Sequence, residues 1–188
     1  MKPVDFVHSV VTGPARRRAG MTVVAFALFV CAVLGVVALA LWADRRLGIR
    51  LGMSDRVALA TGLLVLGFGA ALVSWCVLVF GAAGGTPVPF SPPRGVVMRG
   101  PYRRVRNPML TGFFAALAGV GLALRSPALL FVVVPAVAAV AWLELRLIEE
   151  PELKRRFGAA YVEYRRCVPM FMPSVGRARR AAAGGGAR

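Results

Sequence analysis

The chain has few acidic side chains and almost no histidine. Of its 188 residues, 24 are Lys or Arg, 8 are Asp or Glu and one is His, which gives a formal net charge of +16. Such an excess can indicate nucleic-acid binding, but here the basic residues fall between long apolar runs and form no single basic face. We therefore expect no nucleic-acid partner and interpret the charges as topology signals. The lone His8 lies in a polar N-terminal segment, where a solvated role is expected.

Cysteines are also scarce. Cys31, Cys76 and Cys167 show no spacing typical of metal ligands, and the first two lie inside apolar runs. The sequence therefore predicts neither a disulfide framework nor a metal site.

Long apolar runs are abundant instead, with 58% hydrophobic residues and a mean hydropathy of +0.69. Four runs are candidates for membrane spans: 21–42, 57–80, 108–124 and 128–148. At ~1.5 Å per residue a span must cover a hydrocarbon core of ~30 Å, and the third run is short for this task. We predict an all-α membrane protein with four transmembrane helices, the last two forming a C-terminal hairpin at Arg125, Ser126 and Pro127.

The predicted domain organisation has three parts. Residues 1–80 hold an N-terminal pair of transmembrane helices, and small residues in the second span favour close helix packing. Residues 81–173 hold a loop rich in glycine and proline up to residue 108, the hairpin, and an amphipathic cytoplasmic helix over 149–166. Residues 174–188 form a basic tail of mainly Arg, Ala and Gly, which we expect to be disordered.

The distribution of basic residues predicts the orientation. With four spans and both termini in the cytoplasm, most Lys and Arg residues lie on the cytoplasmic side, as the positive-inside rule requires. We expect an integral protein of the plasma (inner) membrane. This orientation places the loop ending at Pro108 and the segment after Ile148 on one side, where they can form one site.

Charged residues gather where spans meet the membrane surface. Glu144, Arg146, Glu149 and Glu150 lie at the end of the fourth span, and Arg146 can pair with either following glutamate within one helical turn. The segment 100–108 adds three arginines and a tyrosine before the third span, and taken alone it resembles a basic collar for anionic lipid headgroups. Together the two segments offer both signs of charge, which suits a zwitterionic ligand.

Two blocks of motif residues then resemble a known group of enzymes. The first comprises Gly100, Pro101, Tyr102, Arg103, Arg106, Asn107, Pro108 and Gly112, similar to the pattern G-P-Y-R-x-x-R-H-P-x-Y-x-G, followed by Gly119 and Gly121 as a G-x-G. The second comprises Glu149, Glu150, Leu153, Phe157, Gly158, Tyr161, Tyr164, Val168 and Pro169. Over residues 95–173 the chain resembles the isoprenylcysteine carboxyl methyltransferases and phospholipid methyltransferases, which are integral membrane enzymes.

This resemblance implies methyl transfer from S-adenosyl-L-methionine to a lipophilic acceptor that enters from the bilayer. The acceptor stays open between an isoprenylcysteine-type carboxylate, a phospholipid amine and a small lipophilic thiol or phenol. The cofactor-binding candidates that the resemblance implies are Tyr102, Arg103, Arg106, Asn107, Pro108, Gly112, Gly119, Gly121, Glu149 and Glu150. The catalytic candidates are Glu144 and Arg146, with Glu144 or Glu150 as acceptor of a proton from an amine.

Two positions depart from the family pattern. Asn107 stands where many members have histidine, and Leu110 stands where many have tyrosine. Asparagine still donates and accepts hydrogen bonds, whereas leucine does neither. These departures motivate the alternative hypothesis of a non-catalytic membrane protein that keeps the fold and serves in lipid binding or assembly.

Overall fold

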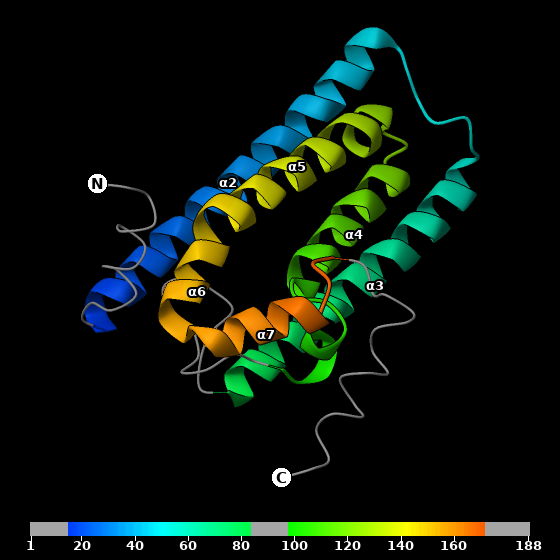
Figure 1. The fold of residues 1–188 in the computed structure, drawn as a ribbon. Coiled ribbons are helices and arrows are strands. Elements are labelled where there is room, and N and C mark those ends of the chain that lie inside the picture. Colours follow the sequence, from blue (N-terminus) through cyan, green and yellow to red (C-terminus); the bar gives the residue numbers. More distant parts are fainter. Residues whose placement is uncertain (1–14, 84–97, 172–188) are drawn as a thin grey trace.

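The computed structural model describes residues 15–83 and 98–171, and within these ranges the chain is helical without a strand (Figure 1). The elements are α2 (Ala15–Leu47), α3 (Asp55–Ala82), η1 (Gly100–Arg103), α4 (Pro108–Ala123), η2 (Leu129–Val133), α5 (Val134–Glu144), η3 (Leu145–Glu149), α6 (Glu150–Phe157) and α7 (Ala159–Cys167). The expected glycine- and proline-rich part of the loop and the predicted basic tail fall almost entirely outside the described residues.

Among the described residues, three helices are long and apolar enough to cross a membrane: Val23–Leu47, Asp55–Ala82 and Leu129–Phe157. The first two contain the spans predicted at 21–42 and 57–80. The third predicted span corresponds to α4, which has 16 residues and so a length of only ~24 Å. For the described residues the all-helical fold is therefore confirmed, with helices that could cross a membrane, while the number of four spans stays a prediction.

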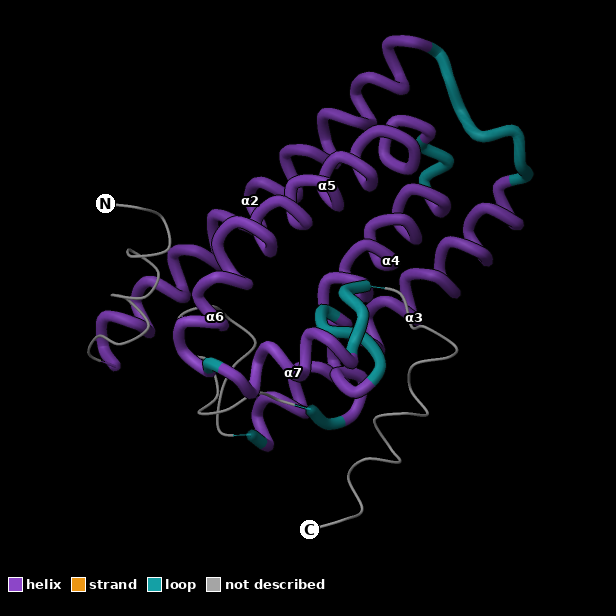
Figure 2. Tube along the Cα trace, viewed as in Figure 1, coloured by secondary structure: helices purple, strands orange, loops and turns teal. Residues whose placement is uncertain are grey.

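The end of the fourth span differs from the prediction. The helix that begins at Leu129 continues through α6 to Phe157, so the expected amphipathic helix over 149–166 is not one element. Gly158, at φ 56°, breaks the chain direction, and α7 then runs across the end of the other helices (Figure 2). A positive φ favours glycine, so the break occurs at the residue that tolerates it.

Two π-helical turns, η2 and η3, interrupt this long helix. Each ends two residues before a proline, Pro135 or Pro151. Proline has no N–H to donate and its ring crowds the carbonyl four residues earlier, so the turn widens to longer-range hydrogen bonds. The wider turn at 145–149 changes the angular register of the side chains that follow it.

Helices α3 and α4 pack through small residues. A Cβ added to Gly62, Gly69 or Gly119 would lie within 3.0 Å of backbone atoms of the partner helix. By contrast, Gly67 on α3 has nothing within 4 Å of such an atom. Close backbone approach is the typical way for helices to associate in lipid, as expected from the small residues in the sequence.

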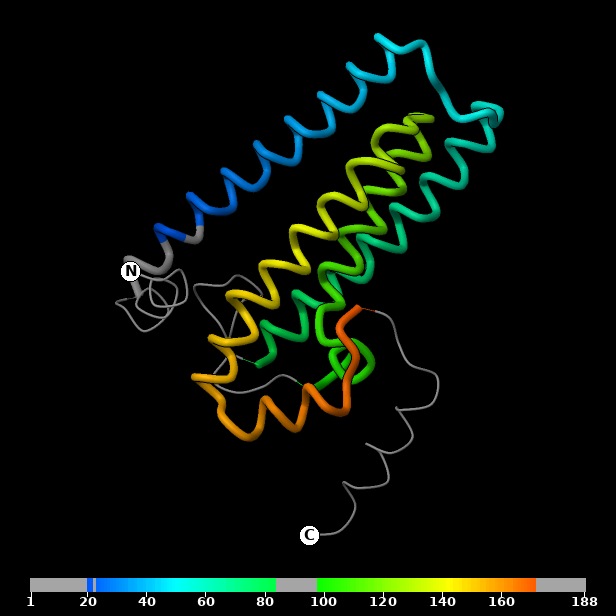
Figure 3. The backbone as a smooth tube through the Cα atoms, turned by 45° about the horizontal axis from the view of Figure 1, so that its top comes forward, coloured from blue at the N-terminus to red at the C-terminus, as the bar shows by residue number. Residues whose placement is uncertain are grey.

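Helix α2 meets the other helices over a limited part of its length (Figure 3). Ala40 packs against Leu117 and Leu129, and Phe29 contacts Phe113 with ring centroids 5.3 Å apart. Much of the remaining apolar surface of α2 is exposed, as is usual for a helix that faces lipid.

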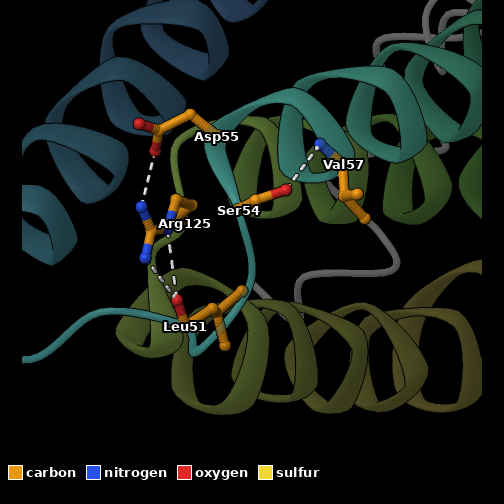
Figure 4. A network of polar contacts seen from close by, with 5 residues as sticks. All are labelled: Leu51, Ser54, Asp55, Val57 and Arg125. Carbon is orange, nitrogen blue, oxygen red and sulfur yellow. Dashed lines mark hydrogen bonds and ion pairs between the residues drawn. The ribbon is translucent and has the colours of Figure 1, made fainter.

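At the end of the helices away from α6 and α7, a polar network fixes the turns (Figure 4). The Arg125 guanidinium donates to the carbonyl of Leu51 from Nε (3.1 Å) and Nη2 (2.9 Å) and pairs with Asp55 at 2.5 Å. Ser54 caps α3 by accepting from the N–H of Val57. Arg125, which follows the end of α4, is thus held by Leu51 and by Asp55 at the start of α3.

Candidate functional site

The two motif blocks meet through their backbones at the start of α4. The N–H of Arg106 donates to the carbonyl of Pro169 (2.8 Å), and the N–H of Asn107 donates to the carbonyl of Met170 (3.0 Å). The hydroxyl of Thr111 donates to the carbonyl of Phe171 at 3.2 Å. Segments some 60 residues apart in the sequence are therefore joined, as expected for one site.

A buried tyrosine strengthens this junction. The Tyr164 hydroxyl donates to the carbonyl of Tyr102 at 2.8 Å, and both side chains are buried. Burial raises the pKa of the Tyr164 phenol above its ordinary value, so the hydroxyl keeps its proton and remains a donor. Tyr161, Tyr164 and Val168 form the small core under this bond.

The charged centre of the site is Glu150. Its Oε1 accepts from Arg106 Nη1 at 2.5 Å, and its Oε2 lies 3.2 Å from Arg165 Nη1. The side chains of Arg106 and Glu150 are only 11% and 6% exposed, whereas that of Arg165 is 46% exposed. The Nε of Arg106 is buried and has no hydrogen-bond partner among the described residues. A buried donor without a partner can bind an anionic group that enters the site.

Beside this centre lies a recess of about 40 Å³. It is lined by Arg106, Asn107, Leu145, Glu149, Glu150, Leu153, Tyr161 and Tyr164. Since one water needs roughly 10 to 15 Å³ on this measure, the recess admits a few waters or one charged group. It fits the carboxylate or ammonium of an amino acid but not a nucleoside, so a whole S-adenosyl-L-methionine would require the recess to open.

The profile described as phospholipid methyltransferase matches residues 57–160, more than half of the chain. The chain belongs to the phospholipid methyltransferase family. The match covers α3, the first motif block, α4 and the long helix up to the start of α7. No curated protein and no solved structure matches the chain.

Four of the predicted cofactor-binding residues of this phospholipid methyltransferase family member meet at the recess: Arg106, Asn107, Glu149 and Glu150. The side chain of Glu149 has no hydrogen bond or ion pair that involves another described residue. No group of three or more His, Cys, Asp or Glu side chains that could hold a metal occurs in the described ranges. The polar side chains that line the recess are two carboxylates, a guanidinium group, an amide and two phenols.

Other predicted residues lie elsewhere. Glu144 and Arg146 are exposed and do not line the recess, and the Arg146 guanidinium lies 5.1 Å from the centre of the Trp142 ring. The ion pair expected between Arg146 and Glu149 or Glu150 is absent from the described contacts, because Glu150 pairs with Arg106 and Arg165 after the wide turn of η3.

In the first motif block, too, some of the predicted residues line the recess and others do not. Tyr102 is buried against Phe80, with ring centroids 5.0 Å apart, whereas Arg103 is exposed. Pro108 is buried as the first residue of α4. None of these three side chains lines the recess. They fix the course of the backbone on which Arg106 and Asn107 stand.

The predicted glycines serve helix packing in this family member. Gly112 and Gly119 face α3, and a Cβ on Gly121 would lie 2.9 Å from Leu130. None of the three lines the recess. A motif glycine can thus be required for the approach of two helices that position the site, without contact to a ligand.

The sequence-based site omitted Arg165, Tyr161, Tyr164, Leu145 and Leu153, all of which contact Glu150 or line the recess. The two tyrosines and Leu153 were noted as motif residues on an amphipathic face, so their spacing was a usable signal. No local pattern pointed to Arg165, because its partner Glu150 lies 15 residues away beyond the break at Gly158.

Proposed function

We propose that this family member is an S-adenosyl-L-methionine-dependent methyltransferase that methylates the amine of a phospholipid headgroup at the cytoplasmic face of the inner membrane. The observation that carries this proposal is the convergence of both motif blocks on Glu150 and Arg106, beside a recess at one end of apolar helices. The acceptor is proposed from the family name; the isoprenylcysteine-type carboxylate is the competing acceptor. The orientation with both termini cytoplasmic is proposed from the positive-inside rule.

The residues at the recess suit the charged end of the cofactor. Arg106, with its unpartnered Nε, would hold the carboxylate, and Glu150 would hold the ammonium. The side chain of Asn107 lies beside them with both a donor and an acceptor. When bound, the cofactor supplies a methyl group already activated by its sulfonium. The main tasks of the protein are therefore to align the acceptor with this methyl group and to exclude water.

An amine acceptor must be neutral to attack the methyl carbon. Glu149 lines the recess without an ion pair to another described residue, so it is better placed to take the amine proton than Glu144, which is exposed outside it. The lipid tail would remain in the bilayer beside the apolar helices while the headgroup reaches the surface recess.

The first test is calorimetric titration of the detergent-solubilised protein with S-adenosylhomocysteine. We expect saturable binding by the wild type, and at least a tenfold loss in Glu150→Gln, about the effect of one charge-assisted hydrogen bond. Glu163→Gln is the matched control, because Glu163 is exposed on α7 and does not line the recess. Size-exclusion chromatography and thermal unfolding establish that each variant is folded.

Absence of binding by folded wild-type protein would favour the non-catalytic alternative, in which the fold serves lipid binding or assembly. If binding occurs, transfer of labelled methyl groups in nanodiscs decides the acceptor. Methylation of phosphatidylethanolamine on its headgroup amine would support the proposal. Methylation of a farnesylcysteine analogue alone would replace the amine by a carboxylate acceptor.

A further inference from the structure

A second, larger recess is lined by residues at the end of α2 and the end of α4. Figure 1 shows that these ends lie away from α6 and α7. The volume of the recess is about 300 Å³, and its lining combines the end of α2, the turn after it and the end of α4. The lining residues are Leu41, Asp44, Arg45, Gly48, Ile49, Arg50, Leu124 and Arg125. This volume lies at the lower end of the ~300 to 1,000 Å³ range of small-molecule sites.

The recess carries uncompensated positive charge. The buried carboxylate of Asp44 is already engaged, since one oxygen accepts from the Ser126 hydroxyl and the other from the N–H of Ala128 at 3.1 Å. Arg125 is engaged with Leu51 and Asp55. Arg45 and Arg50 form no ion pair with any residue in the two described ranges. Two guanidinium groups are therefore available to an anion.

The position of the recess fits a lipid headgroup. The candidate span of α2 ends at Leu47, so Arg45 and Arg50 lie where the chain leaves the apolar layer. Leu41, Ile49 and Leu124 add apolar surface to the same recess, and the last two are 41% and 51% exposed. Guanidinium groups beside apolar side chains at this depth match a phosphate ester that carries acyl chains.

We propose that this recess binds the phosphate of an anionic phospholipid in the leaflet opposite the candidate methyl-transfer site. The inference is independent of the proposed enzymatic function, because it uses none of the residues around Glu150. A phosphate oxygen accepts from Arg45 and Arg50, and the lipid chains extend along the exposed apolar side chains of the neighbouring helices.

The test uses the full chain in nanodiscs of phosphatidylcholine with a minor fraction of phosphatidylglycerol, and native mass spectrometry to count retained lipids. We expect one phosphatidylglycerol to remain on the wild type and its affinity to fall about tenfold or more in the double variant Arg45→Gln/Arg50→Gln. Arg46→Gln is the matched control, because Arg46 lies over the Trp42 ring at 5.5 Å and does not line the recess. Its expected loss is below about twofold.

An equal loss in Arg46→Gln would overturn the proposal, since it would show diffuse surface attraction. Displacement of the lipid by glycerol 3-phosphate at similar concentration would also overturn it, by assigning the recess to a soluble phosphate ester. If the double variant does not fold, Arg50→Gln alone gives the same comparison, because Arg50 lies in the turn between α2 and α3 and is exposed.

Discussion

The two ends of the helices each hold an arginine–carboxylate pair at 2.5 Å, but in very different surroundings. The Arg106 and Glu150 side chains are 11% and 6% exposed, whereas the Asp55 side chain, paired with Arg125, is 87% exposed. Distance alone therefore says little about energy. If one partner of a buried pair is removed, the remaining charge is left without a partner and without water. If one partner of an exposed pair is removed, water hydrates the remaining charge.

The largest expected effect comes from removing the buried carboxylate. In Glu150→Ala the buried Arg106 loses the carboxylate that accepts from its Nη1. Its Nε already lacks a hydrogen-bond partner among the described residues. We expect a loss of about 3 to 5 kcal/mol in the free energy of unfolding. Chemical or thermal unfolding in detergent measures it.

A loss below about 1 kcal/mol would show that Arg106 reaches water in solution and that the two ends do not differ as the exposed fractions indicate. The variant Arg106→Met/Glu150→Leu separates charge from packing. It should recover much of the stability, because replacing both partners by apolar groups leaves no unpaired charge.

The contact between α3 and α4 links the two ends of the helices. Disturbing this contact should have the second-largest effect on the free energy of unfolding. Gly69→Ala places a Cβ 2.5 Å from the carbonyl oxygen of Gly112, so α4 must move, together with Asn107 before it and Arg125 after it. We expect a loss of about 1 to 3 kcal/mol, as for overpacked cores. Gly67→Ala is the control on the same helix, because nothing lies within 4 Å of the added atom.

Equal unfolding free energies for the Gly69→Ala and Gly67→Ala variants would contradict the close packing of the two helices. A shift in lipid binding at the far recess, together with reduced ligand binding near Glu150, would show that α4 transmits the displacement to both ends.

Alkaline pH should lower the stability through groups at the Glu150 end of the helices. All three tyrosines, Tyr102, Tyr161 and Tyr164, lie at the Glu150 end, and burial raises the pKa of each above its ordinary value of 10.0. Above about pH 10 the unfolded chain loses phenol protons while the folded chain keeps them, so the stability present below that pH declines as pH rises. The decline is up to about 1.4 kcal/mol per pH unit for each tyrosine.

Near-ultraviolet absorbance measures the tyrosinate formed. The folded protein should show little at pH 10, whereas protein in denaturant titrates normally. Tyr164→Phe should reduce the pH-dependent loss of stability, since one of the three buried phenols no longer titrates. Normal titration in the folded state would mean that the tyrosine cluster is open to water.

The sequence predicted the helices better than their ends. Apolar runs located α2 and α3, because lipid exposure demands continuous apolar surface, and the motif blocks located Arg106, Asn107, Glu149 and Glu150 at one recess. Regular helical spacing predicted the wrong side-chain positions after residue 144, because a π-helical turn shifts the register and Gly158 ends the helix. The position of Arg165 beside Glu150 depends on that break, which no periodic pattern encodes.

The smallest effect is expected at the exposed pair. Asp55→Ala removes one partner of Arg125, but the guanidinium keeps two hydrogen bonds to the Leu51 carbonyl and remains partly accessible to water. We expect a change of about 0 to 1 kcal/mol in the free energy of unfolding, and less at high salt. Arg125→Gln should cost more than Asp55→Ala, because it also removes the donors that hold the turn at Leu51. If Asp55→Ala instead matches Glu150→Ala, the ion pair at this end is as poorly hydrated as the one at the candidate site, and burial no longer distinguishes the two ends.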